Sequence, residues 1–86
     1  PSPVKTATSA SDYFVQAESF ARSGKRTEAL TAANQAIRAN ANFATAYVVR
    51  GNVRLNQNDL QGAIADFNQA IRLDSTLVSA YMGRGL

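Results

Sequence analysis

The chain has 86 residues, of which 45% are hydrophobic and 17% are charged, and its formal net charge is +3. It contains no cysteine and no histidine, which excludes disulfides, thiolate nucleophiles, zinc sites built on these residues and Ser-His-Asp triads from this chain. No apolar run approaches the roughly 20 residues that span a bilayer, so we expect no membrane insertion.

Residues 1–9 read as a tail or linker, because they hold two prolines and Val4 is their only large aliphatic residue. Such a segment has little apolar surface to bury against a core. The chain begins with Pro1 and not with methionine, which favours an excised piece or a processed product of a longer protein. Ser9 is expected to cap the first helix, with Asp12 favourably placed near the positive end of that helix.

Residues 10–43 are predicted to form two helices joined by a tight turn. The apolar positions of the first helix are Tyr13, Ala17, Phe20 and Ala21, and those of the second are Ala29, Leu30, Ala33, Ala36 and Ile37. Each set recurs at a spacing of three or four residues, which is typical of one face of an amphipathic helix. Gly24 lies in the predicted turn at 23–26 and suits the left-handed conformation that ends many helices.

Residues 44–77 repeat this plan. The apolar positions are Tyr47, Val48, Val49, Gly51 and Leu55 in the first helix, and Ala63, Ile64, Phe67, Ala70 and Ile71 in the second. A polar turn at 56–59 separates them, and the Asp59 carboxylate can accept from the free amides of the next helix. Asp74 and Ser75 are candidate caps for a further helix over 78–86.

The two helix pairs are copies of each other at a spacing of 34 residues, with no gap. The pentapeptide Asn-Gln-Ala-Ile-Arg at 34–38 recurs unchanged at 68–72, and the same shift relates Tyr13, Tyr47 and Tyr81. A period of about 20 to 50 residues is typical of a stacked-repeat architecture. We therefore predict an all-α fold of about five helices. Its units are residues 10–43, residues 44–77 and, at 78–86, the first helix of a truncated third unit.

These motifs resemble the tetratricopeptide repeat, a helix-turn-helix unit of 34 residues. The resemblance rests on Tyr13, Ala17, Phe20, Ala29 and Ala36 in the first unit, and on Tyr47, Gly51, Ala63, Phe67 and Ala70 in the second. It covers residues 10–86 and implies a right-handed superhelical stack. The chain departs from the family pattern where a unit usually closes with proline, since Ala41 and Ser75 stand there, and where the pattern has leucine. The residues at the leucine positions are Gln16, Arg50 and Arg84.

The resemblance also implies a function, namely a scaffold that binds a peptide or protein segment on the concave face formed by the first helices of the units. In the family, the fifth and ninth positions of a unit are the usual contacts. In this chain they are Phe14 and Glu18, Val48 and Asn52, and Met82 and Leu86, and Asn56 extends the polar part by one turn. For Phe14 and Val48, packing against the neighbouring helices is an equal alternative.

Some members of the family bind the acidic C-terminal tails of heat-shock chaperones through a clamp of lysine, arginine and asparagine. The resemblance places the first positions of that clamp at Phe14 and Glu18, where lysine and asparagine are needed. Its later positions fall on Val49, Ser79 and Gly83, which do not match either. We therefore expect no binding of chaperone tails.

The pattern does not indicate catalysis, and we expect no enzyme activity, no cofactor and no metal site. Most of the six Asp and Glu residues fall near turns or on outward helix faces, where capping and solvation account for them. The arginines that recur in register, Arg38 with Arg72 and Arg50 with Arg84, are interpreted as solvated side chains on helix faces. We expect no nucleic acid partner, because the aromatic residues occupy helix-stacking positions and not an exposed stripe.

An alternative function is self-association, or structural stacking within a larger protein. A third unit that ends at Leu86 lacks its second helix, which leaves the side of Tyr81 without a cover. Stacked repeats are usually stable with about three units and a capping element. This reading predicts homo-oligomers formed through the open C-terminal end. The sequence does not indicate a compartment.

Overall fold

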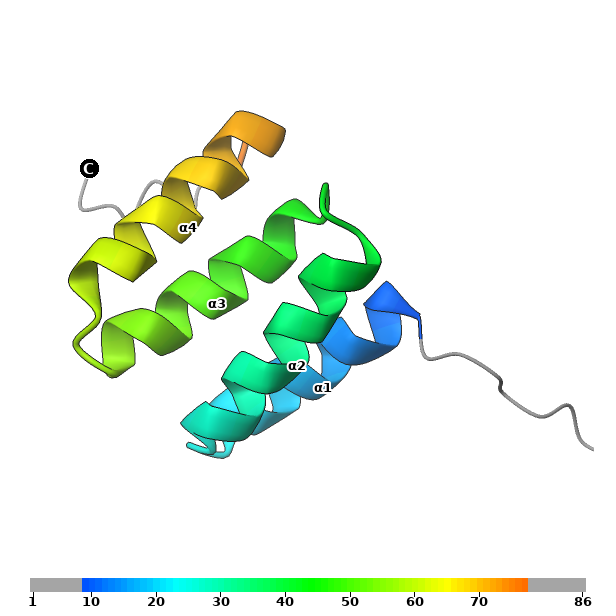
Figure 1. Cartoon of the computed structure of the whole chain (residues 1–86), viewed down its shortest axis with the longest axis vertical. Coiled ribbons are helices and arrows are strands. Elements are labelled where there is room, and N and C mark those ends of the chain that lie inside the picture. Colours follow the sequence, from blue (N-terminus) through cyan, green and yellow to red (C-terminus); the bar gives the residue numbers. More distant parts are fainter. Residues whose placement is uncertain (1–8, 78–86) are drawn as a thin grey trace, which may run out of the picture.

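The computed structural model of the chain describes residues 9–77, and within them it holds four α-helices and no strand (Figure 1). These helices are α1 (Ala10–Arg22), α2 (Arg26–Ala39), α3 (Ala44–Asn56) and α4 (Leu60–Leu73). The prediction of an all-α helical repeat is confirmed. The helix expected over 78–86, with its candidate contact Met82, lies outside the described residues.

The helix ends follow the capping residues that the sequence offers. At the start of α1, the Ser9 hydroxyl accepts from the Asp12 amide at 3.1 Å, and the Asp12 carboxylate accepts from the Ser9 amide at 3.3 Å. This reciprocal pair satisfies two amides that otherwise lack partners. At the start of α4, the Asp59 carboxylate accepts from the Gly62 amide at 3.0 Å. Both predicted caps are therefore confirmed.

Each boundary of α3 and α4 lies 34 residues after the corresponding boundary of α1 and α2. The turns within the two pairs correspond as well, because Gly24 has a φ of 76° and Asn58, at the same place in the second pair, has a φ of 64°. Glycine and asparagine are the residues that adopt this left-handed conformation most readily. The local sequence thus produces the same helical hairpin twice.

Two clusters of buried side chains hold the helices together. One lies within the second pair, where Val48 of α3 packs with Ala63, Phe67 and Ala70 of α4. The other joins Ala17 of α1 to residues of α2, with Val49 of α3 packed against it. The α2 residues of this cluster are Ala32 and Ala33. The second cluster therefore links the two pairs, and α2 and α3 lie side by side in Figure 1.

Small residues allow this close packing. An added Cβ at Gly51 would lie 2.7 Å from an edge carbon of the Phe67 ring, which is shorter than real Cβ contacts. The Phe67 side chain is fully buried. The glycine of the repeat motif therefore marks a point of close contact between α3 and α4.

Candidate functional site

A shallow pocket with a volume of about 170 Å³ lies between the first helices of the two pairs. Glu18, Ala21 and Arg22 of α1 line one side of it, and Val49 and Asn52 of α3 line the other. The structure thus brings together two residues that the sequence singled out 34 positions apart, Glu18 and Asn52. The aliphatic side chains of Ala21 and Val49 supply the apolar part of the lining.

The polar groups of this pocket are available to a ligand. Within residues 9–77, neither the Glu18 carboxylate nor the Asn52 side-chain amide forms a hydrogen bond or an ion pair with another residue. Glu18 is half-buried and Asn52 is exposed. Unpartnered polar groups beside apolar side chains are a common arrangement at recognition sites.

The other predicted contact residues lie in different surroundings. Phe14 is half-buried, and its ring packs against the Phe43 ring with the centroids 5.0 Å apart and the planes tilted by 36°. Val48 is only 7% exposed and belongs to the core cluster of α3 and α4. Asn56 is exposed at the end of α3. The first two therefore contribute packing in this structure, whereas Asn56 is open to solvent.

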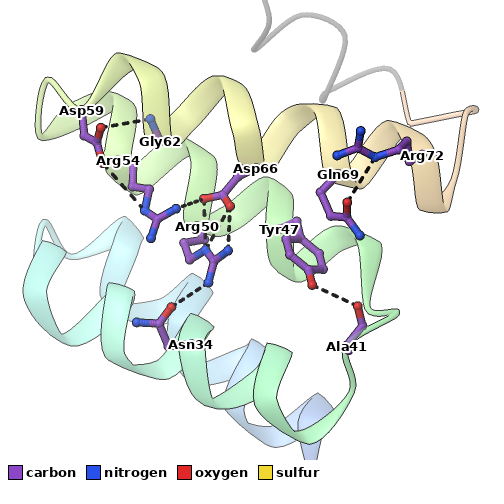
Figure 2. Close-up of polar contacts among 10 residues, drawn as sticks. All are labelled: Asn34, Ala41, Tyr47, Arg50, Arg54, Asp59, Gly62, Asp66, Gln69 and Arg72. Atoms are coloured by element: carbon purple, nitrogen blue, oxygen red, sulfur yellow. Dashed lines mark hydrogen bonds and ion pairs between the residues drawn. The ribbon is translucent and has the colours of Figure 1, made fainter.

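The described residues also contain a buried ion-pair network that the sequence analysis missed (Figure 2). Asp66 of α4 is 2% exposed, and its carboxylate accepts from the Arg50 Nη2 at 2.7 Å and from the Arg54 Nη1 at 3.0 Å. Arg50 also donates through its Nη1 to the Asn34 side-chain oxygen at 2.9 Å, and its guanidinium lies 5.4 Å from the centre of the Tyr47 ring. The network connects α2, α3 and α4.

For Arg50, this network corrects the interpretation of the recurring arginines as solvated side chains, whereas Arg38 and Arg72 are exposed as expected and Arg84 lies outside the described residues. The Arg50 side chain is 18% exposed and is fixed against a carboxylate, because the buried charge of Asp66 requires a partner. The 34-residue register points to the burial of Asp66 only once the burial of the aligned residue in α2 is known. Ala32 stands 34 positions before Asp66 and lies on the buried stripe of α2, so the alignment of the units places Asp66 on the buried stripe of α4.

Other polar contacts lie outside the pocket and the network. Hydrogen bonds from the Thr76 hydroxyl, and then from its amide, hold the pKa of the Asp74 carboxyl below its usual value. Both oxygens of Asp66 accept from guanidinium groups. Within the described part of the chain, no three acidic side chains come together as a metal site, and no helix is long and apolar enough to cross a membrane.

A family model described as tetratricopeptide repeat matches residues 14–77, which covers both helical hairpins described above apart from the start of α1. The chain belongs to the tetratricopeptide repeat (TPR) family. TPR repeats generally mediate protein–protein interactions, and the family is generally a non-catalytic scaffold. No curated protein matches the chain. What the family leaves open is the face of this TPR chain that makes contact and the chemistry of its partner.

Proposed function

We propose that this TPR chain binds a peptide or protein segment across the face formed by α1 and α3. The observation that carries the proposal is the pocket where Glu18 and Asn52 meet with unpartnered polar groups. Asn56 lies one turn beyond Asn52 on α3 and is also exposed, so the polar surface continues along the helix. Amide side chains can both donate to and accept from the backbone of an extended segment.

A binding selection tests this proposal. Random linear peptides displayed on phage are selected on the immobilised 86-residue chain, and the affinities of the enriched peptides are measured by fluorescence polarisation. The double variant Asn52→Ala/Asn56→Ala should weaken binding about tenfold or more, because each lost hydrogen bond contributes about 0.5–1.5 kcal/mol. The control is Gln61→Ala, which removes an exposed amide at the start of α4. Equal affinities of the double variant and the wild type would rule out this face.

A second candidate function, self-association, is supported by apolar side chains at both ends of the described stack. Ile64 of α4 is 46% exposed, and Val15 of α1 is 62% exposed. Val15 stands 34 positions before Val49, which packs against the cluster that joins the two helix pairs. We therefore expect α1 of one copy to pack against α4 of a second copy in the way that α3 packs against α2 within one chain.

Light scattering measures this association directly. The average molecular mass in solution should rise with protein concentration. Val15→Gln should lower this mass towards that of the monomer, because a polar side chain then faces the apolar surface of α4. Such head-to-tail contacts do not close on themselves and give mixed oligomers. The control Leu55→Gln alters a side chain that is 38% exposed at neither end of the stack. A constant monomer mass over the whole concentration range would exclude self-association.

A further inference from the structure

We propose that the pocket between α1 and α3 accepts one cationic side chain, lysine or arginine, of the bound segment, with Glu18 as its counter-charge. This inference rests on the proposed function, because it assigns a chemical preference to the same face. It concerns the residue that determines specificity and not the whole binding surface.

The size and the lining of the pocket fit a single long side chain. Its volume of about 170 Å³ is below the roughly 300–1,000 Å³ of sites that enclose a small molecule. Ala21 and Val49 provide an apolar wall. Lysine and arginine place aliphatic stems on such surfaces while their charged ends reach polar groups at the rim. A shorter polar side chain would not fill the apolar part.

The charges of the pocket select a cation. Glu18 is half-buried, and its carboxylate has no hydrogen-bond or ion-pair partner among residues 9–77. Asn52 lines the opposite side of the pocket, and its side-chain oxygen is an acceptor that suits a second donor of the same cationic group. A charge that is partly removed from water is screened less than an exposed one, so its attraction for an opposite charge is stronger.

Arg22 also lines the pocket, and its charge opposes this preference. It is exposed and lies in the last turn of α1, where the negative end of the helix favours a cation. Its side chain is long enough to turn towards the last carbonyl groups of α1 and into solvent, where salt screens its charge. In this structure Arg22 forms no ion pair with Glu18, so the carboxylate remains open to a cationic group of the ligand.

The peptide selection described above tests the inference when it is run on three proteins: the wild type, Glu18→Gln and Glu28→Gln. Glu28 is exposed on α2, so its replacement makes the same charge change away from the pocket. Peptides selected by the wild type and by Glu28→Gln should share one position that is enriched in lysine or arginine. Peptides selected by Glu18→Gln should lose that enrichment.

A double-mutant cycle then assigns the contact to Glu18. In the best wild-type peptide, replacing the shared lysine by norleucine keeps the stem and removes the charge. The wild type should bind the norleucine peptide about tenfold more weakly, as expected for a hydrogen bond between charged groups, and Glu18→Gln should bind both peptides equally. Circular dichroism melts should show that both variants fold like the wild type.

The outcomes separate the two proposals. Peptides that bind through the α1–α3 face but carry no basic position, or a norleucine peptide that binds the wild type as well as the lysine peptide does, would overturn this inference alone. The proposed binding function would then stand. A selection that enriches no peptide at all would overturn the binding function and the cationic subsite together.

Discussion

A buried carboxylate costs free energy unless its charge and its lone pairs are satisfied. Asp66 meets this condition through two arginines of the neighbouring helix, with Arg50 and Arg54 both within 3.0 Å of its oxygens. The Arg50 side chain also donates through its Nη1 to the side-chain oxygen of Asn34. Among residues 9–77, no buried side-chain nitrogen or oxygen is without a hydrogen-bond partner. The network is therefore complete, and Asp66 is the member on which both arginines depend.

The variant Asp66→Ala should lower the free energy of unfolding by about 3–5 kcal/mol, because it leaves the partly buried Arg50 without a counter-charge and leaves Arg54 with only the longer ion pair to Asp59 at 3.9 Å. Chemical denaturation followed by circular dichroism measures the loss. A domain of this size has a thin margin of stability. The denaturant titrations of the wild type and the variant should therefore both start from a solution that contains a stabilising osmolyte, which keeps the variant folded at the start. A loss below about 1 kcal/mol would contradict the network's contribution.

The first helix pair supplies a matched control for Asp66→Ala. The residues that this pair has at the three positions of the network are Gln16, Phe20 and Ala32. The triple variant Arg50→Gln/Arg54→Phe/Asp66→Ala installs that set in the second pair, and it should be more stable than Asp66→Ala alone. Replacing all charged members by packed neutral ones removes both the charge and the need for a partner. A triple variant that is less stable than the single one would mean that the network fits a shape that these neutral residues do not reproduce.

Gly51 offers a test in which two effects have opposite signs. Helix propensity alone predicts that Gly51→Ala stabilises the chain by about 1 kcal/mol, because glycine is a poor helix former. The contact of 2.7 Å between an added Cβ and the buried Phe67 ring predicts a loss of about 1–3 kcal/mol through overpacking. We expect the overpacking to prevail, so the thermal midpoint should fall. A rise in the midpoint would show that Phe67 can move aside.

At the scale of the helix, the sequence predicted the boundaries well because the determinants are local. A capping serine with an acidic residue three positions later, a glycine at a left-handed position and a 34-residue register each act within one or two turns. The pocket residues Glu18 and Asn52 were predicted from the resemblance to the family, and the register only aligned them with each other. What could not be read locally was burial. Val48 and Asp66 are buried because α3 and α4 approach closely at Gly51, and a linear pattern does not give the distance between two helices.

The two equivalent helices α2 and α4 differ at their N-caps, which makes a further prediction. α4 begins after Asp59, whose carboxylate accepts a hydrogen bond, whereas α2 begins after Lys25, which makes no such bond. Lys25→Asp should therefore stabilise the chain by about 0.5–2 kcal/mol, since it adds an acceptor for the free amides and a negative charge at the positive helix end. The reciprocal change, Asp59→Lys, should destabilise the chain by a similar amount. Denaturation midpoints that shift in the same direction in both variants would contradict the capping argument.

Across the whole molecule, the two helix pairs depend on each other. A cluster built from Ala17, Ala32 and Ala33, with Val49 of α3 packed against it, joins them through apolar contact, and the Arg50–Asn34 hydrogen bond joins them through polar contact. In a repeat protein, stability is roughly the sum of the stability of each unit and a term for each interface between units. A single helix pair is too small to be stable alone, so the interface term decides whether the described part of the chain unfolds as one body.

The variant Asn34→Ala tests this coupling, because it removes the hydrogen-bond acceptor from α2 and leaves the residues of α3 and α4 unchanged. Arg50 remains paired with Asp66 and retains some access to water, so the loss should be about 1–2 kcal/mol. If the two pairs unfold together, the variant should lower the free energy of hydrogen exchange in α4 by the same amount as in α2.

The control is Thr31→Ala, an exposed side chain of α2 that bonds only within its own helix and should leave the protection of α4 unchanged. Loss of protection in α2 with full protection in α4 would show that the two pairs unfold independently. The α1–α3 pocket takes its lining from both pairs, so it would then be lost whenever either pair unfolds.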